Sequence, residues 1–584
     1  AQLGDVALYG RERLDGIQKE LREVPGVTVI IYDQVCAAEK RRRRKRGEFP
    51  DPPQRVFIND LVCEGCGDCG VKSNCVSVQP LETEFGRKRR IDQSSCNKDF
   101  SCVNGFCPSF VTVEGGKPRA RAPVSGGVAV PALPEPVEAT GAKSILITGI
   151  GGTGGITVGA VLGMAAHLEG KGCSIVDMTG LSQKNGAVLS HLKIAPSVDT
   201  VYAARVDTAS ADVLLACDMI TAGGGEAAQM LRPGVTAGIV NSNVTPTAAF
   251  TVQRTINFNE AQTARKLQDV LDPAGTAFVP ATALAERLMG DSIAANMMIV
   301  GAACQLGLLP LSRASIEEAV RLNGVSVEQN LLAFALGRWA AIDPQAVAAL
   351  AAPAPGAAAS GSLALSGGLD QLIARRVEFL VGYQNQAYAE SYRTFVEAVR
   401  KAEQAVSPDS EALTGAVARN LFKLMAYKDE YEVARLYTNG EFAEKLKAQF
   451  EGDLKLTFHL SPPMIAPKDP DNGRPRKMTF GPWMLTGFKV LAALKGLRGT
   501  PLDPFGRTAE RRMERQLIRT YRADMERALE VLDAGNIAIV VKLAELPAEI
   551  YGFGYIKDAR VAEAERLRAD LLANLTSPHT IAAE

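Results

Sequence analysis

The sequence predicts a multidomain α/β protein that contains a small cysteine-rich module and a mostly helical C-terminal domain. Its 584 residues correspond to roughly four domains at about 150 residues each. Seven of the eleven cysteines lie between Cys63 and Cys107. Residues 142–343 repeat the order strand, glycine-rich turn and helix, which is typical of a parallel sheet covered by helices. Apolar residues from Leu369 onward recur at helical spacing.

Composition and charge exclude several classes of protein. With 46% hydrophobic and 22% charged residues, the chain is neither disordered nor fibrous. Lys+Arg and Asp+Glu are equal at 65 each, so the overall charge predicts neither nucleic acid nor a membrane as a partner. Two uncharged stretches, 145–167 and 293–309, are predicted to be a strand-turn-helix and a buried helix rather than membrane spans.

The first residues predict a domain whose beginning lies elsewhere. The chain starts at Ala1 rather than at methionine and has no signal peptide. A charged helix is expected over Leu8–Val24 and a buried strand over Val27–Tyr32, and such a pair cannot bury a core alone. We therefore expect residues 1–47 to end a domain of a longer polypeptide. The other expected boundaries are 48–118 for the cysteine-rich module, 119–141 and 344–368 for two linkers, 142–343 for the α/β domain, and 369–584 for the mostly helical domain, with a strand over 454–460.

The cysteine spacing is the most specific signal in the sequence. Successive thiolates three residues apart can wrap a small cuboidal iron-sulfur cluster, whereas zinc sites use two separated pairs. The chain carries the two runs Cys63-x2-Cys66-x2-Cys69-x5-Cys75 and Cys96-x5-Cys102-x4-Cys107-Pro108. A dense thiol cluster without a secretory signal also favours a reducing, cytoplasmic compartment. We expect an iron-sulfur module that relays electrons, with structural zinc as the alternative.

The assignment of cysteines to clusters follows the crossed pattern of two-cluster ferredoxins, in which the fourth cysteine of one motif binds the other cluster. One complete set is then Cys63, Cys66, Cys69 and Cys107. The second set, Cys75, Cys96 and Cys102, is one thiol short. Asp99 or water could complete this second set, it could hold a three-iron cluster, or its cysteines could be structural. Four further cysteines in apolar surroundings are expected in the core: Cys36, Cys173, Cys217 and Cys304.

A glycine-rich turn predicts contact with a phosphate group. The strand 144–148 leads directly into the turn, which is followed by a helix from Ile156. Glycines at such a turn let the backbone approach a phosphate at the helix N-terminus. The alternative is a turn that packs closely and binds nothing. The candidate residues of the turn are Gly149, Gly151, Gly152, Thr153 and Gly154.

A polar loop downstream supplies further candidate contacts. It follows the strand that ends near Asp177, which stands about where a ribose-binding acid would lie. Its candidate contacts are Gln183, Lys184, Asn185 and Ser190. The neighbouring His191 is more simply a strand residue with satisfied hydrogen bonds.

Seven consecutive basic residues, Lys40–Arg46, form the largest local charge. A solvated helix end is the simplest explanation. Because the run lies shortly before Cys63, docking of an acidic ferredoxin by electrostatic steering is a second hypothesis.

In this order the segments resemble the 2-oxoacid:ferredoxin oxidoreductases, and most closely the long, fused bacterial indolepyruvate ferredoxin oxidoreductases. The resemblance covers nearly the whole chain. Residues 149–154, 182–186, 296–301 and 307–311 resemble the family's gamma domain, which is Rossmann-like. Residues 29–42 resemble the end of its thiamine-diphosphate domain, and 424–431 resemble its C-terminal domain.

The resemblance implies a reaction and its cofactors. Thiamine diphosphate with magnesium attacks the 2-oxo carbon of an aryl-pyruvate, carbon dioxide leaves, and electrons pass singly through one or two 4Fe-4S clusters to ferredoxin. Coenzyme A takes the acyl group. The Gly-Asp-Gly signature of the thiamine site is absent from this sequence, so the thiamine-binding and pyrimidine-binding domains are expected upstream in the same polypeptide, and this chain alone is expected to be inactive. A homodimer is implied as well.

Two other functions fit the same residues. An NAD(P)- or flavin-linked iron-sulfur oxidoreductase would hold its nucleotide at the Gly149 turn. In the second, non-enzymatic reading, zinc stabilises the cysteine-rich module and the α/β domain is an assembly surface.

Overall fold

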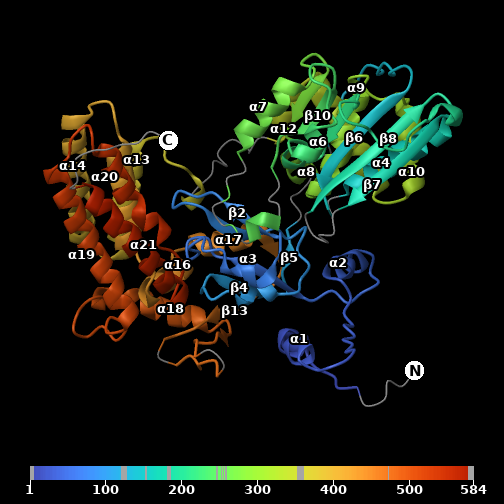
Figure 1. Ribbon diagram of the computed structural model, residues 1–584. Helices are drawn as coiled ribbons and strands as arrows, with labels where there is room; N and C mark the ends of the chain where they lie inside the picture. The colour runs from blue at the N-terminus through green and yellow to red at the C-terminus, as the bar shows by residue number, and fades with distance from the viewer. Residues whose placement is uncertain are drawn as a thin grey trace. The chain divides into compact units, whose positions relative to one another are not determined.

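The computed structural model describes the whole chain except residues 1–5, 120–127, 152–153, 180–185, 245–247, 252, 254–255, 257–258, 352–360, 464, 471–472 and 576–584. The described chain forms two compact units, Ala1–Asp51 and Pro52–Glu584 (Figure 1).

The first unit contains two short helices, α1 (Leu14–Arg22) and α2 (Ala37–Lys45). The basic run therefore lies mostly on a helix. The expected strand over Val27–Tyr32 is wrong, because no strand is assigned there and the side chains of Val27 and Ile31 are 96% and 64% exposed. A strand needs a neighbour for its backbone groups, and the described part of this unit offers no second strand. Cys36, expected in a core, is exposed.

The cysteine-rich region shares a sheet with the C-terminal part of the chain. Strands β1 (Gln54–Ile58) and β4 (Phe110–Glu114) pair antiparallel, and β13 (Lys455–Leu460) pairs with the other edge of β4. The sheet order is β1-β4-β13-β14, with β14 at Met478–Phe480 (Figure 1). The strand expected over 454–460 is thus confirmed. The other elements of the cysteine-rich region are α3 (Asp68–Ser73), β2 (Val78–Leu81), β3 (Lys88–Ile91), and β5 (Lys117–Pro118), which pairs with β12 (Phe450–Glu451).

One hydrophobic core joins these two parts of the chain. Alternate residues of β4 and β13, among them Val111, Val113 and Phe458, pack against α16 (Glu430–Thr438) and neighbouring helices. Polar contacts reinforce the junction. The Asn59 amide donates to the Leu436 carbonyl at 3.0 Å.

The α/β domain contains a six-stranded sheet in the order β11-β10-β9-β6-β8-β7. Strands β6, β9, β10 and β11 are parallel, as expected, but β8 is antiparallel to both of its neighbours. Only seven residues, 180–186, separate β7 from β8 along the chain, and such a short connection suits an antiparallel pair. The strands are β6 (Lys143–Ile150), β7 (Gly172–Thr179), β8 (Ala187–Ala195), β9 (Val213–Ala216), β10 (Ala237–Asn241) and β11 (Thr276–Val279). The helices are α4 (Gly155–Leu168), α5 (Met219–Ala222), α6 (Gly225–Ala228), α7 (Glu260–Val270), α8 (Ala281–Met289), α9 (Ala295–Gln305), α10 (Arg313–Asn323), α11 (Val327–Ile342) and α12 (Pro344–Ala351).

Parts of the two expected linkers lie against folded elements. The Ala139 N–H donates to the Leu309 carbonyl at 3.0 Å, and the Arg338 guanidinium donates to the Pro134 carbonyl at 2.9 Å. In the second segment, α12 occupies its start, and the Ser362 hydroxyl donates to the Asp60 carboxylate at 2.6 Å.

Helices α9 and α11 cross at two glycines. A Cβ atom at Gly301 would lie 2.0 Å from the Phe334 carbonyl oxygen, and one at Gly337 would lie 2.0 Å from the Met298 carbonyl oxygen. Backbone atoms cannot swing away as a side chain can. The two helices therefore approach each other closely because both positions lack a side chain.

We expect Gly301→Ala to destabilise the α/β domain, because the added methyl group must push the two helices apart. Overpacking of a core typically costs about 1–3 kcal/mol, and this site should lie at the upper end. The thermal unfolding midpoint measures the effect. Gly225→Ala is the matched control, since nothing lies within 4 Å of its added Cβ. Equal midpoints for the two variants would contradict the close crossing.

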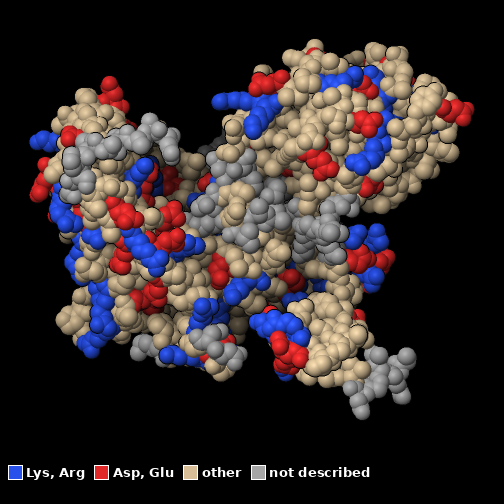
Figure 2. Space-filling model, in the orientation of Figure 1, with Lys and Arg blue, Asp and Glu red and all other residues tan. Residues whose placement is uncertain are grey.

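The C-terminal region is mostly helical, as expected. Its core contains buried tyrosines such as Tyr383 and Tyr392, whose hydroxyls donate to the carbonyls of Tyr427 and Ala418. Lys, Arg, Asp and Glu are interspersed over its surface in Figure 2. No helix in the described part of the chain is both long and apolar enough to cross a membrane. The remaining helices are α13 (Leu369–Tyr383), α14 (Gln386–Val406), α15 (Ala412–Met425), α17 (Glu441–Gln449), α18 (Met484–Ala493), α19 (Ala509–Glu530), α20 (Ile537–Glu545) and α21 (Tyr555–Leu575).

Candidate functional site

Four cysteines share one buried environment. Burial raises the pKa of Cys63, Cys66 and Cys69, and for each of them Cys107 is the next largest cause. Cys63 also contributes to the raised pKa of Cys66 and Cys69. A cysteine from the end of the module therefore lies among the three from its start. This is the set that the crossed assignment predicts.

Three other cysteines form a second environment. Burial is the largest cause of the raised pKa of Cys102, and electrostatic interactions with Cys96, Cys75 and Asp99 raise it further. The raised pKa of Cys96 has the same origins, with burial first and Cys75 and Asp99 among the others. The carboxylate proposed as a possible fourth ligand thus lies beside the incomplete set.

Two glycines shape the loop that carries Cys63, Cys66 and Cys69. Gly65 and Gly67 have φ values of +65° and +82°, a region that favours glycine. A Cβ atom at Gly65 would also lie 2.2 Å from the Arg87 carbonyl oxygen. The loop can turn tightly here because no side chain is present.

Hydrogen bonds reach the sulfur atoms of both sets. The Gly65 N–H donates to Cys63 Sγ at 3.3 Å, and the Lys98 N–H donates to Cys96 Sγ at 3.4 Å. The Ser109 hydroxyl lies 3.0 Å from Cys107 Sγ. Hydrogen bonds to cluster sulfurs are one of the means by which proteins set a reduction potential.

The donor set of the first environment fits a cuboidal cluster. Cys63, Cys69 and Cys107 are buried, Cys66 is half-buried, and Cys107 acts electrostatically on the other three. Each thiolate of a cuboidal cluster binds a different iron. Within the described residues, no three His, Cys, Asp or Glu side chains converge closely enough to hold a single metal ion. The raised pKa values mean that metal binding must release the thiol protons, because only thiolates are ligands.

Lysines from distant parts of the chain lie near the thiols. Cys63 and Glu64 act electrostatically on the buried Lys88, whose pKa is lowered to about 8 by burial and then by Lys428. The Lys477 ammonium donates to the Val103 carbonyl at 2.9 Å, and Cys107, Cys69 and Cys102 act on it electrostatically. Burial lowers the pKa of Lys477, while these three thiols and Asp68 oppose that shift. Positive charge therefore lies beside both sets.

The C-terminal region covers the first set. The Tyr437 hydroxyl donates to the Pro108 carbonyl at 2.7 Å, and a Cβ atom at Gly552 would lie 3.5 Å from Cys66 Cβ. Phe553 packs against the hydrophobic core that contains Cys63, Cys69 and Cys107. Glu64, next to Cys63, pairs with Lys428. Burial opposes ionisation of Glu64, but Lys428 and Lys88 outweigh it and lower its pKa to about 2.

The glycine-rich turn is partly described. A Cβ atom at Gly149 would lie 3.8 Å from the Gly155 Cα atom, so the start of the turn packs closely on the first residue of α4. The Gly151 N–H donates to the Gly186 carbonyl at 2.8 Å. Gly154 has a φ of +92° and precedes α4. The candidate contacts that lie outside the described residues are Gly152, Thr153, Gln183, Lys184 and Asn185.

Two further candidate residues have protein partners. The Ser190 hydroxyl donates to the Asp177 carboxylate. His191 is fully buried, and its Nδ1 accepts a hydrogen bond from the Val206 N–H at 3.1 Å. Burial lowers the pKa of the His191 imidazole. The interpretation of His191 as a satisfied strand residue is confirmed.

The lysines near the thiols carry no signal in the sequence. Lys88 lies in a basic stretch of ordinary appearance, and Lys477 follows a proline-rich loop about 370 residues after Cys107. Neither position carries a motif. Only the pairing of β4 with β13 could have indicated that the loop after β13 lies near the cysteines.

Comparisons with known proteins identify two segments. Residues 144–340 match the family described as pyruvate ferredoxin/flavodoxin oxidoreductase, and residues 369–570 match a family of unknown function, DUF6537. The chain is similar to the indolepyruvate oxidoreductase subunit IorB of Thermococcus kodakarensis, with 28% identity over 34% of this chain and 95% of that protein. The same subunit of Pyrococcus horikoshii is 29% identical over equal shares. The structure also aligns with the gamma subunit of a keto/oxoacid ferredoxin oxidoreductase from Geobacter sulfurreducens, with a TM-score of 0.25, 22% identity, and coverage of 34% of this chain and 98% of that chain.

The family match covers the α/β domain, in which β6 precedes the glycine-rich turn and α4 follows it, as predicted for the gamma domain. Residues 144–340 therefore form a domain that matches the pyruvate ferredoxin/flavodoxin oxidoreductase family.

Proposed function

We propose that this chain is the electron-relaying part of an indolepyruvate-type 2-oxoacid:ferredoxin oxidoreductase. The observation that supports it most directly is the meeting of Cys63, Cys66, Cys69 and Cys107 in one buried environment. These four residues would hold a 4Fe-4S cluster, which supplies one-electron transfer when bound. Cys75, Cys96 and Cys102, with Asp99 or water, would hold a second cluster.

The whole reaction needs more than this chain. The substrate would be an aryl-pyruvate that is oxidatively decarboxylated, with thiamine diphosphate and magnesium held by upstream domains of the same polypeptide. Coenzyme A would accept the acyl group. The turn at Gly149 to Gly154, with Gln183 and Asn185, would contact a phosphate group of such a ligand. Close packing of Gly149 on Gly155 also fits a turn that contacts no ligand.

The electron acceptor would be ferredoxin, in the cytoplasm, and the enzyme would be a homodimer. Helix α2 carries most of the run Lys40–Arg46 and offers a cationic surface to an acidic partner. Electron transfer that slows as ionic strength rises is expected from such docking, because salt screens exposed charges.

The test is direct transfer of electrons from the chain to ferredoxin. The anaerobically purified chain is reduced with dithionite, freed of the reductant and mixed with oxidised ferredoxin in a stopped-flow spectrometer. Loss of ferredoxin absorbance is the expected result. Reduction of NAD(P)+ or of a bound flavin in place of ferredoxin would favour the nucleotide-linked alternative. A colourless, zinc-containing chain that transfers no electrons would favour the structural one.

A further inference from the structure

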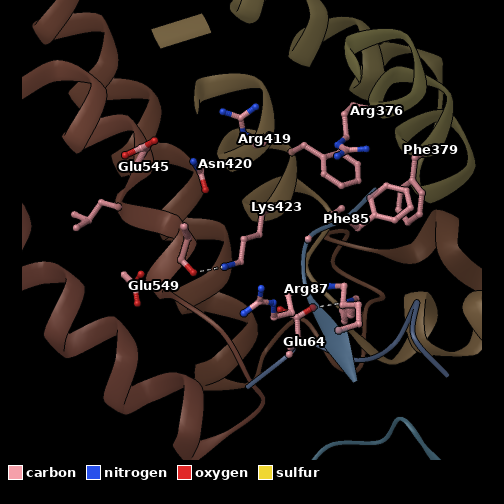
Figure 3. A pocket seen from close by; sticks show the side chains of 18 of the residues that line it. Glu64, Phe85, Arg87, Arg376, Phe379, Arg419, Asn420, Lys423, Glu545 and Glu549 are labelled. Carbon is pink, nitrogen blue, oxygen red and sulfur yellow. Dashed lines mark hydrogen bonds and ion pairs between the residues drawn. The ribbon is translucent and has the colours of Figure 1, made fainter. Parts of the chain in front are cut away.

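A large open cavity lies between the cysteine-rich region and the C-terminal helices. Its volume is about 860 Å³, within the range of about 300–1,000 Å³ that small-molecule sites occupy. Figure 3 shows Arg419, Asn420 and Lys423 on one helix, with Glu64 and Arg87 on a separate segment of the chain. Gly65, between two of the cysteines, also lines the cavity. A bound molecule would therefore lie close to the first cysteine set.

The charge of the lining favours an anion. Seven basic and four acidic side chains line the cavity, an excess of three positive charges. Two of the acids are already paired, because Glu64 binds Lys428 and Glu82 binds Arg87. Neither pair leaves a free carboxylate for the other lysines.

Lys88 is a buried cation in the cavity lining that has no carboxylate of the described residues close to its ammonium group. The residue is 7% exposed and lines the cavity. Among the described residues, no carboxylate lies within 4.0 Å of its ammonium group, and its electrostatically strongest acidic neighbour, Glu64, is held by Lys428. An unpaired buried charge is costly, so an anion in this cavity would gain more from Lys88 than from an exposed lysine.

The far wall of the cavity is aromatic. Phe85 and Phe379 are half-buried, and their ring centroids lie 5.1 Å apart in a tilted arrangement. The Arg376 guanidinium lies over the Phe85 ring at 4.6 Å, and its Nε atom has no hydrogen-bond partner among the described residues. Such a wall can hold a second ring system by edge or offset contact.

We propose that this cavity binds an aromatic carboxylate, with its charged group at Lys88 and its ring against Phe85 and Phe379. The choice of an aromatic carboxylate rests on the proposed function, because an aryl-pyruvate and the aryl-acetate formed by hydrolysis of its acyl product both belong to this class. Every residue that lines the cavity belongs to this chain. The bound anion would add negative charge beside Cys63 and lower the midpoint potential of a cluster there.

Isothermal titration calorimetry of the anaerobic, full chain with indole-3-acetate and phenylacetate tests the proposal. We expect one site per chain for both acids, with at least tenfold weaker binding of acetate, inorganic phosphate and neutral indole. Lys88→Gln should weaken binding of the aryl-acetates at least tenfold. Arg90→Gln on the same strand is the matched control, since Arg90 is exposed and pairs with Gln79, and it should change the affinity less than twofold.

A second variant covers the case in which Lys88→Gln disturbs folding. Phe379→Leu should weaken binding of the aryl-acetates at least fivefold and leave the weak binding of acetate unchanged. Absence of binding to the unmodified chain, equal binding of phosphate, or unchanged affinity in both variants would overturn the proposal. Iron measured on the same samples separates the two claims: an iron-free chain that binds aryl-acetates contradicts only the relay, and an iron-replete chain that does not bind them contradicts only the cavity.

Discussion

Replacing Cys107 with serine is expected to remove the first cluster, whereas Cys75→Ser is expected to leave that cluster in place. The loss in Cys107→Ser should be about four irons per chain, together with most of the electron transfer to ferredoxin. The reason is the environment of the two thiols. Cys107 contributes electrostatically to the raised pKa values of Cys63, Cys66 and Cys69, whereas Cys75 contributes to those of Cys96 and Cys102.

Sequence order alone would predict the opposite. Cys75 ends the run that starts at Cys63, so it would be the fourth ligand if each run held its own cluster. Iron analysis and electron paramagnetic resonance of the reduced variants measure the difference. Cys304→Ser, a buried cysteine in the α/β core, controls for the loss of a thiol elsewhere. A Cys75→Ser variant that loses the same signal as Cys107→Ser would show that the sets are not crossed.

Replacing Lys477 with methionine is expected to lower the midpoint potential of the cluster while iron content stays the same. The Lys477 ammonium lies among Cys107, Cys69 and Cys102, and a positive charge stabilises the reduced, more negative cluster. For two charges that are not in direct contact at an effective dielectric constant of about 20, we expect an interaction of about 1–2 kcal/mol, or roughly 40–90 mV for one electron. Methionine keeps most of the length of the side chain and removes the charge together with the hydrogen bond to the Val103 carbonyl.

A redox titration followed by electron paramagnetic resonance gives the potential. Lys455→Met is the matched control, because Lys455 is exposed at the start of β13 and its charge is screened by solvent. The control should move the potential by less than about 10 mV, as expected for a screened charge. A shift in Lys477→Met no larger than in the control would mean that this lysine does not act on the cluster.

The sequence predicted the elements whose pattern is local. Strands β6, β9, β10 and β13 lie where apolar runs or alternation indicated them. Such strands can be predicted because the burial of a strand determines which of its consecutive residues are apolar. The crossed grouping of the cysteines also followed from spacing and from the chemistry of cluster ligands. The buried strand predicted at Val27–Tyr32 failed, since the same pattern without a neighbouring strand leaves the residues exposed.

The pairing of strands that lie far apart in the chain could not be predicted from the sequence. Strand β8 is antiparallel to β6 in the same sheet, and the pairing of β13 with β4 joins residues more than 300 positions apart. Lys88, Lys428 and Lys477 became candidates only through that pairing and the packing around it. A lysine outside a motif has no local signal that distinguishes a buried cation from a solvated one.

The pairing of β4 with β13 also bears on the region that matches the family of unknown function. Residues within 369–570 supply β13, Tyr437, Lys477 and Gly552, all of which lie against the cysteine-rich region. The structure therefore gives this region a place beside the thiols, where it can exclude water and set the local charge.

Iron and acid-labile sulfide per chain, measured after strictly anaerobic purification together with the electron paramagnetic resonance spectrum of the dithionite-reduced chain, test the central claim most directly. The account predicts about four irons and four sulfides for the set that ends at Cys107. If the second set is also filled, it predicts about eight of each for a second four-iron cluster, or about seven irons and eight sulfides for a three-iron cluster. A chain that contains zinc and no iron, with no signal after reduction, would contradict it.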